Sequence, residues 1–377
     1  MALPKSPSSG AFNNTSSTIN KCYVCNKNII TEHSYDEHII LNSLGGKLKS
    51  ESLICRPCSV SLDKIDAALS HSLNSFGLLL GIKRDRGTNP RILVTIIDTG
   101  EEIYLESGGK PVLTNKPIII DNLADNEKPS LIIKVKDEAQ LRKILTGKKR
   151  KNPLLNVEEI VKSAVSRQVE ISFVRYKISL GDEQFRSVCK MAINFYMYHG
   201  GKRDLITHLI PYIKGECNKR CVNYYYPNDL IATSNLSESF VHTLFIKGNP
   251  EEKILYGYIE LYNAFRLIVL LSDSYEESFF QEVYSFDVLS RKEVDKGINI
   301  NISRKEILDL VNNPNPPLEK IDMARKDLEK AIQIHIGIKN ILKNILEGED
   351  VDEKMSQQSI AIKLSKMLWD FMSRLGE

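Results

Sequence analysis

Residues 21–69 read KCYVCNKNIITEHSYDEHIILNSLGGKLKSESLICRPCSVSLDKIDAAL. Two CxxC pairs, Cys22 with Cys25 and Cys55 with Cys58, frame this stretch. Four thiolates in two such pairs can close a tetrahedral zinc site, which would bring the two ends of the stretch together. The competing interpretation, two redox dithiols, lacks the βαβ pattern of thioredoxin-like motifs. We therefore expect a structural Zn²⁺ ion, because four thiolates leave no coordination position open for a substrate.

The segment between the cysteine pairs is predicted to hold two short strands. Residues 35–41 read YDEHIIL and carry Glu37 and His38 at the centre of the first strand. Residues 52–54 read SLI and are predicted to form the second. A glycine pair between the strands permits a tight turn, and a proline two residues after Cys55 suits the first turn of a helix. The predicted order is strand, turn, strand and helix.

The helix after the second cysteine pair is expected over residues 64–80, where apolar residues recur at spacings of three and four. Gly81 is expected to end it. We expect His38 to face the N-terminal part of this helix. A hydrolytic metal ion could then bind between an acidic residue of the strand and a residue of the helix.

The composition is that of a globular protein with two or three domains: 377 residues, of which 42% are hydrophobic and 26% charged. No run of about 18 apolar residues predicts a membrane span. Residues 1–20 are rich in Ser, Asn and Pro, without the apolar region of a secretory signal, and are expected to be a disordered tail. Three further cysteines make an odd remainder, which favours a reducing cytoplasmic location over a disulfide framework.

The pattern along the chain predicts an α+β protein with four units. Residues 21–81 form the zinc unit. Residues 88–152 carry short β-branched runs broken by Gly and Asn, which predict a small antiparallel β region. Residues 154–302 are expected to form a mixed α/β recognition or regulatory domain. Residues 303–377 are expected to be helical and to end in a helical hairpin.

Basic residues cluster at two places after the zinc unit. A net charge of +3 says little about partners, but clustered Lys and Arg side chains can neutralise phosphates. The alternative for such a short run is a solvated loop. The candidate nucleic-acid-binding residues are Lys83, Arg84, Arg86, Lys148, Lys149, Arg150 and Lys151.

The motif EHIILNSLGGK followed by LICRPC resembles the HNH endonuclease family with a ββα-metal fold, in the branch that a four-cysteine zinc site staples. The resemblance covers about residues 22–69. It implies that His38 is the general base that activates water and that Glu37 ligates a catalytic divalent ion, Mg²⁺ or Mn²⁺. It also implies hydrolysis of DNA phosphodiesters, with bacterial anti-phage defence as a setting.

Two positions depart from the family pattern. Ser59 stands after the last cysteine, where members of this branch usually have a metal-binding Asn. Asp63, one helical turn further on, is the candidate that would compensate as a ligand. Asn42 is the candidate for orienting His38, with Ser52 as the alternative. A second acid–histidine pair at residues 32–33 is the weaker candidate, because the glycine spacing favours His38.

Three functions remain open at this point. The first is a metal-dependent DNA endonuclease, expected as a homodimer because cutting both strands of a duplex usually needs two active sites. The second is a catalytically degenerate zinc module that binds nucleic acid or a partner protein, which Ser59 keeps open. The third makes residues 154–377 a sensor of a ligand or partner that gates the nuclease.

Overall fold

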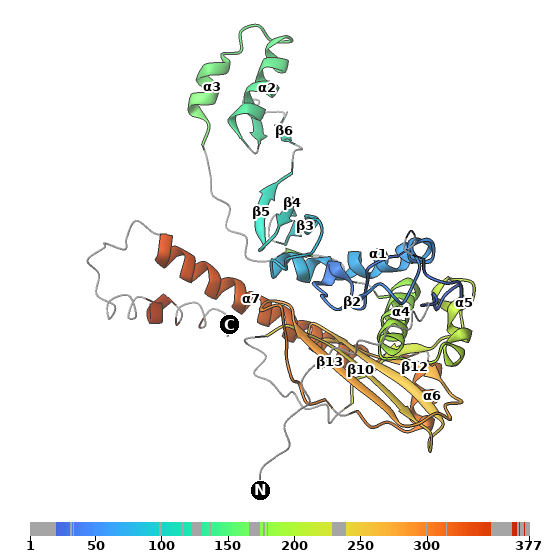
Figure 1. Ribbon diagram of the computed structural model, residues 1–377. Helices are drawn as coiled ribbons and strands as arrows, with labels where there is room; N and C mark the ends of the chain where they lie inside the picture. The colour runs from blue at the N-terminus through green and yellow to red at the C-terminus, as the bar shows by residue number, and fades with distance from the viewer. Residues whose placement is uncertain are drawn as a thin grey trace.

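The computed structural model describes residues 20–347, except 31, 33, 98–99, 115–116, 123–129, 136, 166–173, 176–177, 179, 228–238, 299 and 314, together with residues 364–367, 369 and 373. These residues form a mixed α+β structure, as the sequence predicts (Figure 1). His33 and most of the last predicted helix lie outside the described residues. No described helix carries an apolar stretch long enough to cross a bilayer.

The N-terminal unit, residues 20–81, is a small hairpin followed by a long helix. Strand β1 (Glu37–His38) pairs antiparallel with β2 (Lys49–Ser50), and the short 3-10 helix η2 (Asn42–Leu44) lies in the connection. Helix α1 (Arg56–Leu79) follows, with proline in its first turn. It begins at Arg56, eight residues before the start that the apolar periodicity predicted. Cys55 is its N-cap, and Pro57 stands in its first turn, as the proline after Cys55 suggested.

The second strand lies earlier in the chain than predicted. Strand β2 ends at Ser50, whereas the prediction was residues 52–54. The Ser50 hydroxyl accepts a hydrogen bond from the Ser52 backbone N–H at 3.2 Å, and this local bond bends the chain out of the ladder. Leu53 and Ile54 are still buried, but as core side chains before α1. The apolar run suggested a strand because these residues are buried, although they do not pair with another strand.

The middle of the chain forms a four-stranded antiparallel sheet, a hairpin and two helices. The sheet has the order β5-β4-β3-β8, and β6 pairs with β7. The last turn of α2 contains Lys148 and Lys149, the start of a basic run for which a solvated loop was the alternative interpretation. The bounds are β3 (Ile92–Ile96), β4 (Glu102–Glu106), β5 (Lys110–Leu113), β6 (Ile118–Asn122), β7 (Ser130–Lys134), α2 (Glu138–Lys149), α3 (Val157–Ser163) and β8 (Val174–Arg175).

The C-terminal part is built on a six-stranded antiparallel sheet of order β14-β13-β10-β11-β12-β9. The strands are β9 (Val222–Tyr224), β10 (Val241–Asn249), β11 (Ile254–Leu261), β12 (Phe265–Ser272), β13 (Phe280–Asp287) and β14 (Lys292–Glu293). The helices are α4 (Asp182–Tyr198), α5 (Ile210–Ile213), α6 (Arg304–Asn312) and α7 (Leu318–Glu347), with the 3-10 turns η3 (Arg203–Leu205) and η4 (Thr207–Leu209) between α4 and α5.

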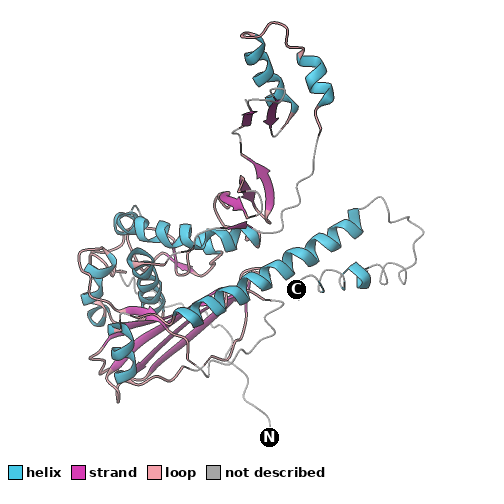
Figure 2. Ribbon diagram, turned by 180° about the vertical axis from the view of Figure 1, so that it is seen from behind, coloured by secondary structure: helices cyan, strands magenta, loops and turns pink. Residues whose placement is uncertain are grey.

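Both faces of the six-stranded sheet are buried. Successive side chains of a strand point to opposite faces, so neighbouring residues of one strand report on both. On β10, Leu244 and Ile246 join the core that includes α4 and α1, whereas Phe245 joins a second core with Ile307 and Val311 of α6. Figure 1 shows α1 and α4 on one side of the sheet. The long helix α7, seen from behind in Figure 2, contributes Leu328 and Ile332 to the same core as α1 and α4. The N-terminal unit and the sheet therefore share one continuous hydrophobic core.

A buried histidine joins the sheet to the glycine turn of the N-terminal unit. The His242 Nδ1 atom accepts a hydrogen bond from the Tyr262 backbone N–H at 3.1 Å, so the proton lies on Nε2, 2.9 Å from the Leu44 carbonyl oxygen. Gly45 follows Leu44 with φ +93°, and a Cβ atom there would lie 2.8 Å from the Ile82 side chain. The turn therefore requires glycine and is bonded directly to β10.

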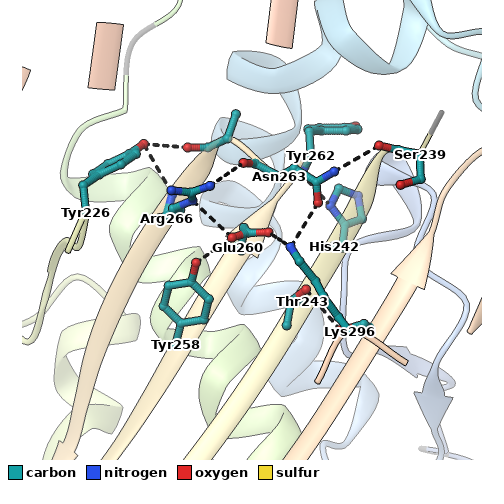
Figure 3. A network of polar contacts seen from close by, with 12 residues as sticks. Tyr226, Ser239, His242, Thr243, Tyr258, Glu260, Tyr262, Asn263, Arg266 and Lys296 are labelled. Atoms are coloured by element: carbon teal, nitrogen blue, oxygen red, sulfur yellow. Dashed lines mark hydrogen bonds and ion pairs between the residues drawn. The ribbon is translucent and has the colours of Figure 1, made fainter. Parts of the chain in front are cut away.

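A buried charge network supports the β11–β12 turn beside this joint (Figure 3). The Glu260 carboxylate, 2% exposed, accepts hydrogen bonds from Tyr258 Oη at 2.6 Å and Arg266 Nε at 3.2 Å, and it also pairs with Lys296. Lys296 Nζ donates to Asn263 Oδ1 at 3.1 Å as well. The turn residue Asn263 has a positive φ of 58°. These bonds hold the turn that presents the Tyr262 N–H to the histidine.

We predict that His242 makes folding sensitive to acid. Burial lowers the pKa of His242 to about 4, below the usual 6.5 of an unfolded chain. As the pH falls below 6.5 the unfolded state binds the proton first, so stability is full above pH 6.5 and is lost towards pH 4. Between pH 7.5 and 5 the parent should lose about 2 kcal/mol more unfolding free energy than His242→Gln, measured by urea denaturation.

The matched control is His71→Gln, at an exposed position on α1. This variant should follow the parent at both pH values. Equal acid losses in the parent and in His242→Gln would contradict the prediction.

Candidate functional site

The four framing cysteines converge on one point. The Sγ atoms of Cys22, Cys25, Cys55 and Cys58 all lie within 4.8 Å of one another, and the Cys25 and Cys55 sulfurs are 3.8 Å apart. A zinc ion with four Zn–S bonds of about 2.3 Å has sulfur–sulfur edges of about 3.8 Å. The donor set and its geometry therefore fit a structural zinc ion, as the spacing predicts.

Residues from two separate parts of the chain hold the first cysteine knuckle in place. The Tyr23 backbone N–H donates to the Leu53 carbonyl at 3.0 Å, which ties the first knuckle to the approach of the second. Arg203, beyond α4, donates from Nε to the Tyr23 carbonyl at 2.7 Å and from Nη2 to the Val24 carbonyl at 3.4 Å. The C-terminal part therefore helps to shape the zinc site.

Glu37 and His38 point away from each other. They are consecutive residues of β1, and consecutive strand residues face opposite sides. Glu37 points to α1, where its Oε2 atom accepts a hydrogen bond from Ser59 Oγ at 3.0 Å. His38 points to the loop after α1, where its Nε2 atom lies 3.4 Å from Asp85 Oδ2. The expectation that His38 faces the start of the helix is therefore wrong, and Glu37 takes that direction.

On the Glu37 side, helix α4 completes a buried polar cluster. Lys190 Nζ lies 2.6 Å from Glu37 Oε1, and Asn194 Nδ2 donates to the same oxygen at 3.1 Å. Lys190 Nζ also lies 2.5 Å from Asp66 Oδ2 of α1. Ser187 Oγ donates to Asp66 Oδ1 at 2.8 Å. The cluster therefore has one cation and two carboxylates, at the interface of α1 and α4.

The sequence prediction missed Lys190, Asp66, Ser187 and Asn194. The signal was present, because Ser187, Lys190 and Asn194 are spaced by three and four in a helix whose neighbouring residues are apolar. That spacing places them on one face. All three are at most 1% exposed. A lysine on such a face needs a buried counter-charge, and this requirement points to a carboxylate elsewhere in the chain.

On the His38 side, the loop after α1 supplies the partners. The Asp85 backbone N–H donates to Asn42 Oδ1 at 2.7 Å. Asp85 also pairs with Lys47 and with Arg291, whose Nη2 atom lies 3.2 Å from Asp85 Oδ1. Asn42 therefore acts on His38 indirectly, by holding the loop that carries Asp85.

A groove with a volume of about 440 Å³ lies next to β2. His38 is not part of its lining, but Asp85, the partner of His38, pairs with two of the lining cations, Lys47 and Arg291. Its walls include Lys47 and Lys49 from the N-terminal hairpin and Arg291 from the β13–β14 connection. Lys49 is the cross-strand partner of His38 and pairs with Asp36. The groove thus combines three cations from two parts of the chain, and His38 is connected to it through Lys49 on the neighbouring strand and through Asp85. Its acidic side chains are Glu293 in the lining and the pairing carboxylates.

The other predicted residues are not gathered at either side of β1. Asp63 is exposed on α1. Arg84 is half-buried and structural, because its Nη2 atom donates to Asn74 Oδ1 at 2.9 Å and its Nε atom to Asn89 Oδ1 at 2.6 Å. Lys83 and Arg86 are exposed in the same loop. The run from Lys148 to Lys151 lies at the end of α2, in the part that projects away from the sheet (Figure 1).

The pair Glu37 and Ser59 does not fit a catalytic Mg²⁺ or Mn²⁺ ion in this arrangement. Mg²⁺ takes oxygen ligands at about 2.0–2.1 Å in near-octahedral geometry and usually keeps several waters. Here Ser59 donates a hydrogen bond to one Glu37 oxygen, and Lys190 and Asn194 contact the other. The Glu37 side chain is only 4% exposed, so little of the carboxylate reaches solvent.

Comparison with known proteins identifies the N-terminal unit. A family model described as HNH endonuclease matches residues 22–74, the stretch that holds all four clustered cysteines. This region is an HNH endonuclease domain, which confirms the resemblance seen in the sequence. Neither the curated proteins nor the solved structures contain a match to the chain.

We predict that the cysteine cluster carries zinc. Protein with Cys58→Ser should retain much less than the parent's content of about one zinc ion per chain, because a fourth thiolate is needed to close the tetrahedron. Its unfolding midpoint should fall, since zinc binding contributes directly to folding. Elemental analysis of dialysed protein measures the first effect and thermal denaturation the second.

Cys217→Ser is the matched control, because Cys217 is a partly buried thiol outside the cluster. It should keep its zinc. Equal zinc contents in parent and Cys58→Ser would contradict the assignment.

Proposed function

We propose that this protein is an endonuclease that hydrolyses phosphodiester bonds in DNA, with His38 as the general base. The observation that carries the proposal is that His38, in an HNH domain, shares its partner Asp85 with Lys47 and Arg291, two cations that line a groove together with Lys49. A base beside clustered cations is what attack of water on a phosphodiester requires.

Each side chain has a defined part in the proposed reaction. His38, oriented by Asp85, would take a proton from the attacking water, since a neutral imidazole is a proton acceptor near pH 7. Lys47, Lys49 and Arg291 would bind phosphate oxygens and offset the charge that develops on them. These cations now pair with Asp36 and Asp85, so DNA phosphates would compete with those carboxylates.

Replacing His38 by Ala should lower DNA cleavage by roughly 10²–10⁴-fold, the usual contribution of a general base. The assay follows nicking of supercoiled plasmid in Mg²⁺, in Mn²⁺ and in a chelator. His71→Ala is the matched control, because His71 is exposed on α1 away from the groove. Undiminished cleavage by His38→Ala would rule out His38 as the base.

A second function, a catalytically silent HNH domain that binds nucleic acid or a partner protein, is favoured by a separate observation. Glu37, the predicted ligand of the catalytic ion, is bonded to Lys190 and Ser59. Parent protein that binds DNA but leaves plasmid intact in all three conditions would support this second function. It would also exclude the first.

DNA binding should depend on the groove. The double variant Lys47→Gln/Lys49→Gln should weaken binding and reduce the slope of log affinity against log salt by about 2, because each phosphate contact contributes about 0.9. Fluorescence anisotropy of a labelled duplex at several salt concentrations measures the slope. Lys148→Gln/Lys149→Gln tests the basic run on α2 separately. If only the Lys148→Gln/Lys149→Gln variant reduced the slope, the assignment of DNA binding to the groove would be wrong.

Cleavage of both strands would be simplest for two copies of the chain, so the homodimer stays part of the proposal. Light scattering at assay concentration measures the mass. A monomeric mass together with full duplex cleavage would rule out the homodimer.

A further inference from the structure

The ammonium group of Lys190 lies where two carboxylates of the HNH domain converge. Its Nζ atom is 2.6 Å from Glu37 Oε1 and 2.5 Å from Asp66 Oδ2. The Lys190 side chain is 2% exposed. Although burial disfavours its charge, the two carboxylates raise the pKa of Lys190 overall, so it remains a cation at neutral pH.

Each oxygen of the two carboxylates already has a partner. Glu37 Oε2 accepts from Ser59, and Glu37 Oε1 binds Lys190 and Asn194. Asp66 Oδ1 accepts from Ser187, and Asp66 Oδ2 binds Lys190. Asn194 is fixed in turn, because its Oδ1 atom accepts from Tyr23 Oη at 2.8 Å. A divalent ion at Glu37 would have to displace these bonds and lie next to an ammonium group.

We infer that Lys190 is a built-in cation that takes the place of the divalent metal ion at the Glu37–Ser59 position of the HNH domain. The charge that a metal would supply is provided by a side chain of α4, and Asp66 serves as its second counter-ion. The position therefore does not bind Mg²⁺ or Mn²⁺ in the folded chain.

The docking of α4 on α1 is extensive enough to keep Lys190 in place. Gln184 Nε2 donates to Ser72 Oγ at 3.0 Å. Apolar residues of both helices, including Leu69 of α1 and Ile193 of α4, belong to the same buried core. Because separating the helices would expose that core to water, the ammonium is a fixed part of the site.

The ion pairing also explains the residue after the last cysteine. An Asn at position 59 would supply an amide oxygen to a metal ion, but here the residue has only to donate a hydrogen bond to Glu37 Oε2. A serine hydroxyl does this at 3.0 Å in a position that is 3% exposed. Ser59 therefore fits a cluster centred on an ammonium group, because an ammonium has no use for another donor and a carboxylate does.

Zinc-loaded full-length protein tests the inference through Mn²⁺ binding, measured by electron paramagnetic resonance of free Mn²⁺. The parent and Glu37→Gln should bind equal amounts of Mn²⁺. Lys190→Ala should bind one additional ion at least about tenfold more tightly than any Glu37-dependent binding in the parent, a factor that corresponds to about 1.4 kcal/mol. The added binding should disappear in Lys190→Ala/Glu37→Gln.

Controls separate the cluster from general effects of charge removal. Lys202→Ala removes an exposed lysine that pairs with Glu277 and should not change Mn²⁺ binding. Circular dichroism and zinc content report whether Lys190→Ala is folded. A folded Lys190→Ala that gains no Mn²⁺ binding would overturn the inference. If that variant does not fold, the parent decides: Mn²⁺ binding lost in Glu37→Gln overturns the inference, and equal binding supports it.

The inference concerns the same domain as the proposed nuclease, but it does not rest on DNA cleavage. Cleavage by the parent that depends on His38 but not on an ion at Glu37 agrees with both. Absence of cleavage would rule out the proposed endonuclease function. The inference about Lys190 would then be decided by the Mn²⁺ binding measurements alone.

Discussion

The Lys190 ammonium group, between Glu37 and Asp66, joins the two halves of this protein. Removing one partner of a buried ion pair typically costs about 3–5 kcal/mol, because the remaining charge is left without compensation. Each member of this cluster therefore constrains the others. Strand β1 must present Glu37 to α1, α1 must present Asp66 two helical turns after Ser59, and α4 must lie across both. The zinc cluster, the hairpin and the six-stranded sheet are arranged so that these conditions are met together.

Strand β1 divides the HNH domain into two chemically different sides. On one side Glu37 is enclosed with a cation and amide and hydroxyl donors, and almost no surface reaches water. On the other side His38 lies beside Asp85, which pairs with cations of an open groove. Because consecutive residues of a strand point to opposite faces, Glu37 and His38 have different partners. The proposed chemistry on nucleic acid relies on His38, with the cations of the groove as its electrostatic support.

The same geometry ties function to the C-terminal part. Arg291 reaches Asp85 from the β13–β14 connection, and His242 bonds the glycine turn at Leu44. Arg203 holds the carbonyl groups of the first cysteine knuckle. These contacts come from separate points of the sheet domain, so that domain shapes the zinc site, the turn and the groove at once. A domain that merely followed the nuclease along the chain would not need to make all three.

Local patterns were sufficient for the elements whose causes are local. Two CxxC pairs specify a zinc-sized cluster, the motif EHIILNSLGGK identifies the HNH domain, and apolar spacing predicts helices such as α6 and α7. The second strand of the hairpin was misplaced, because buried residues before a helix and buried residues of a strand give the same short apolar run. The direction of Glu37 and His38 was also misjudged, since the motif names both residues but does not say which one faces the helix.

By itself, the sequence determined the four clustered cysteines and the identity of the domain that carries them, because those depend on residue types at short, fixed spacings. Only the tertiary structure decided which charge meets Glu37 and which carboxylate meets His38. Lys190 and Asp85 are far from their partners along the chain, and such pairings are set by how α4 and the loop after α1 pack. A long-range ion pair leaves only a weak trace in sequence, a polar residue on an apolar face, whereas folding gives it a partner within 3 Å.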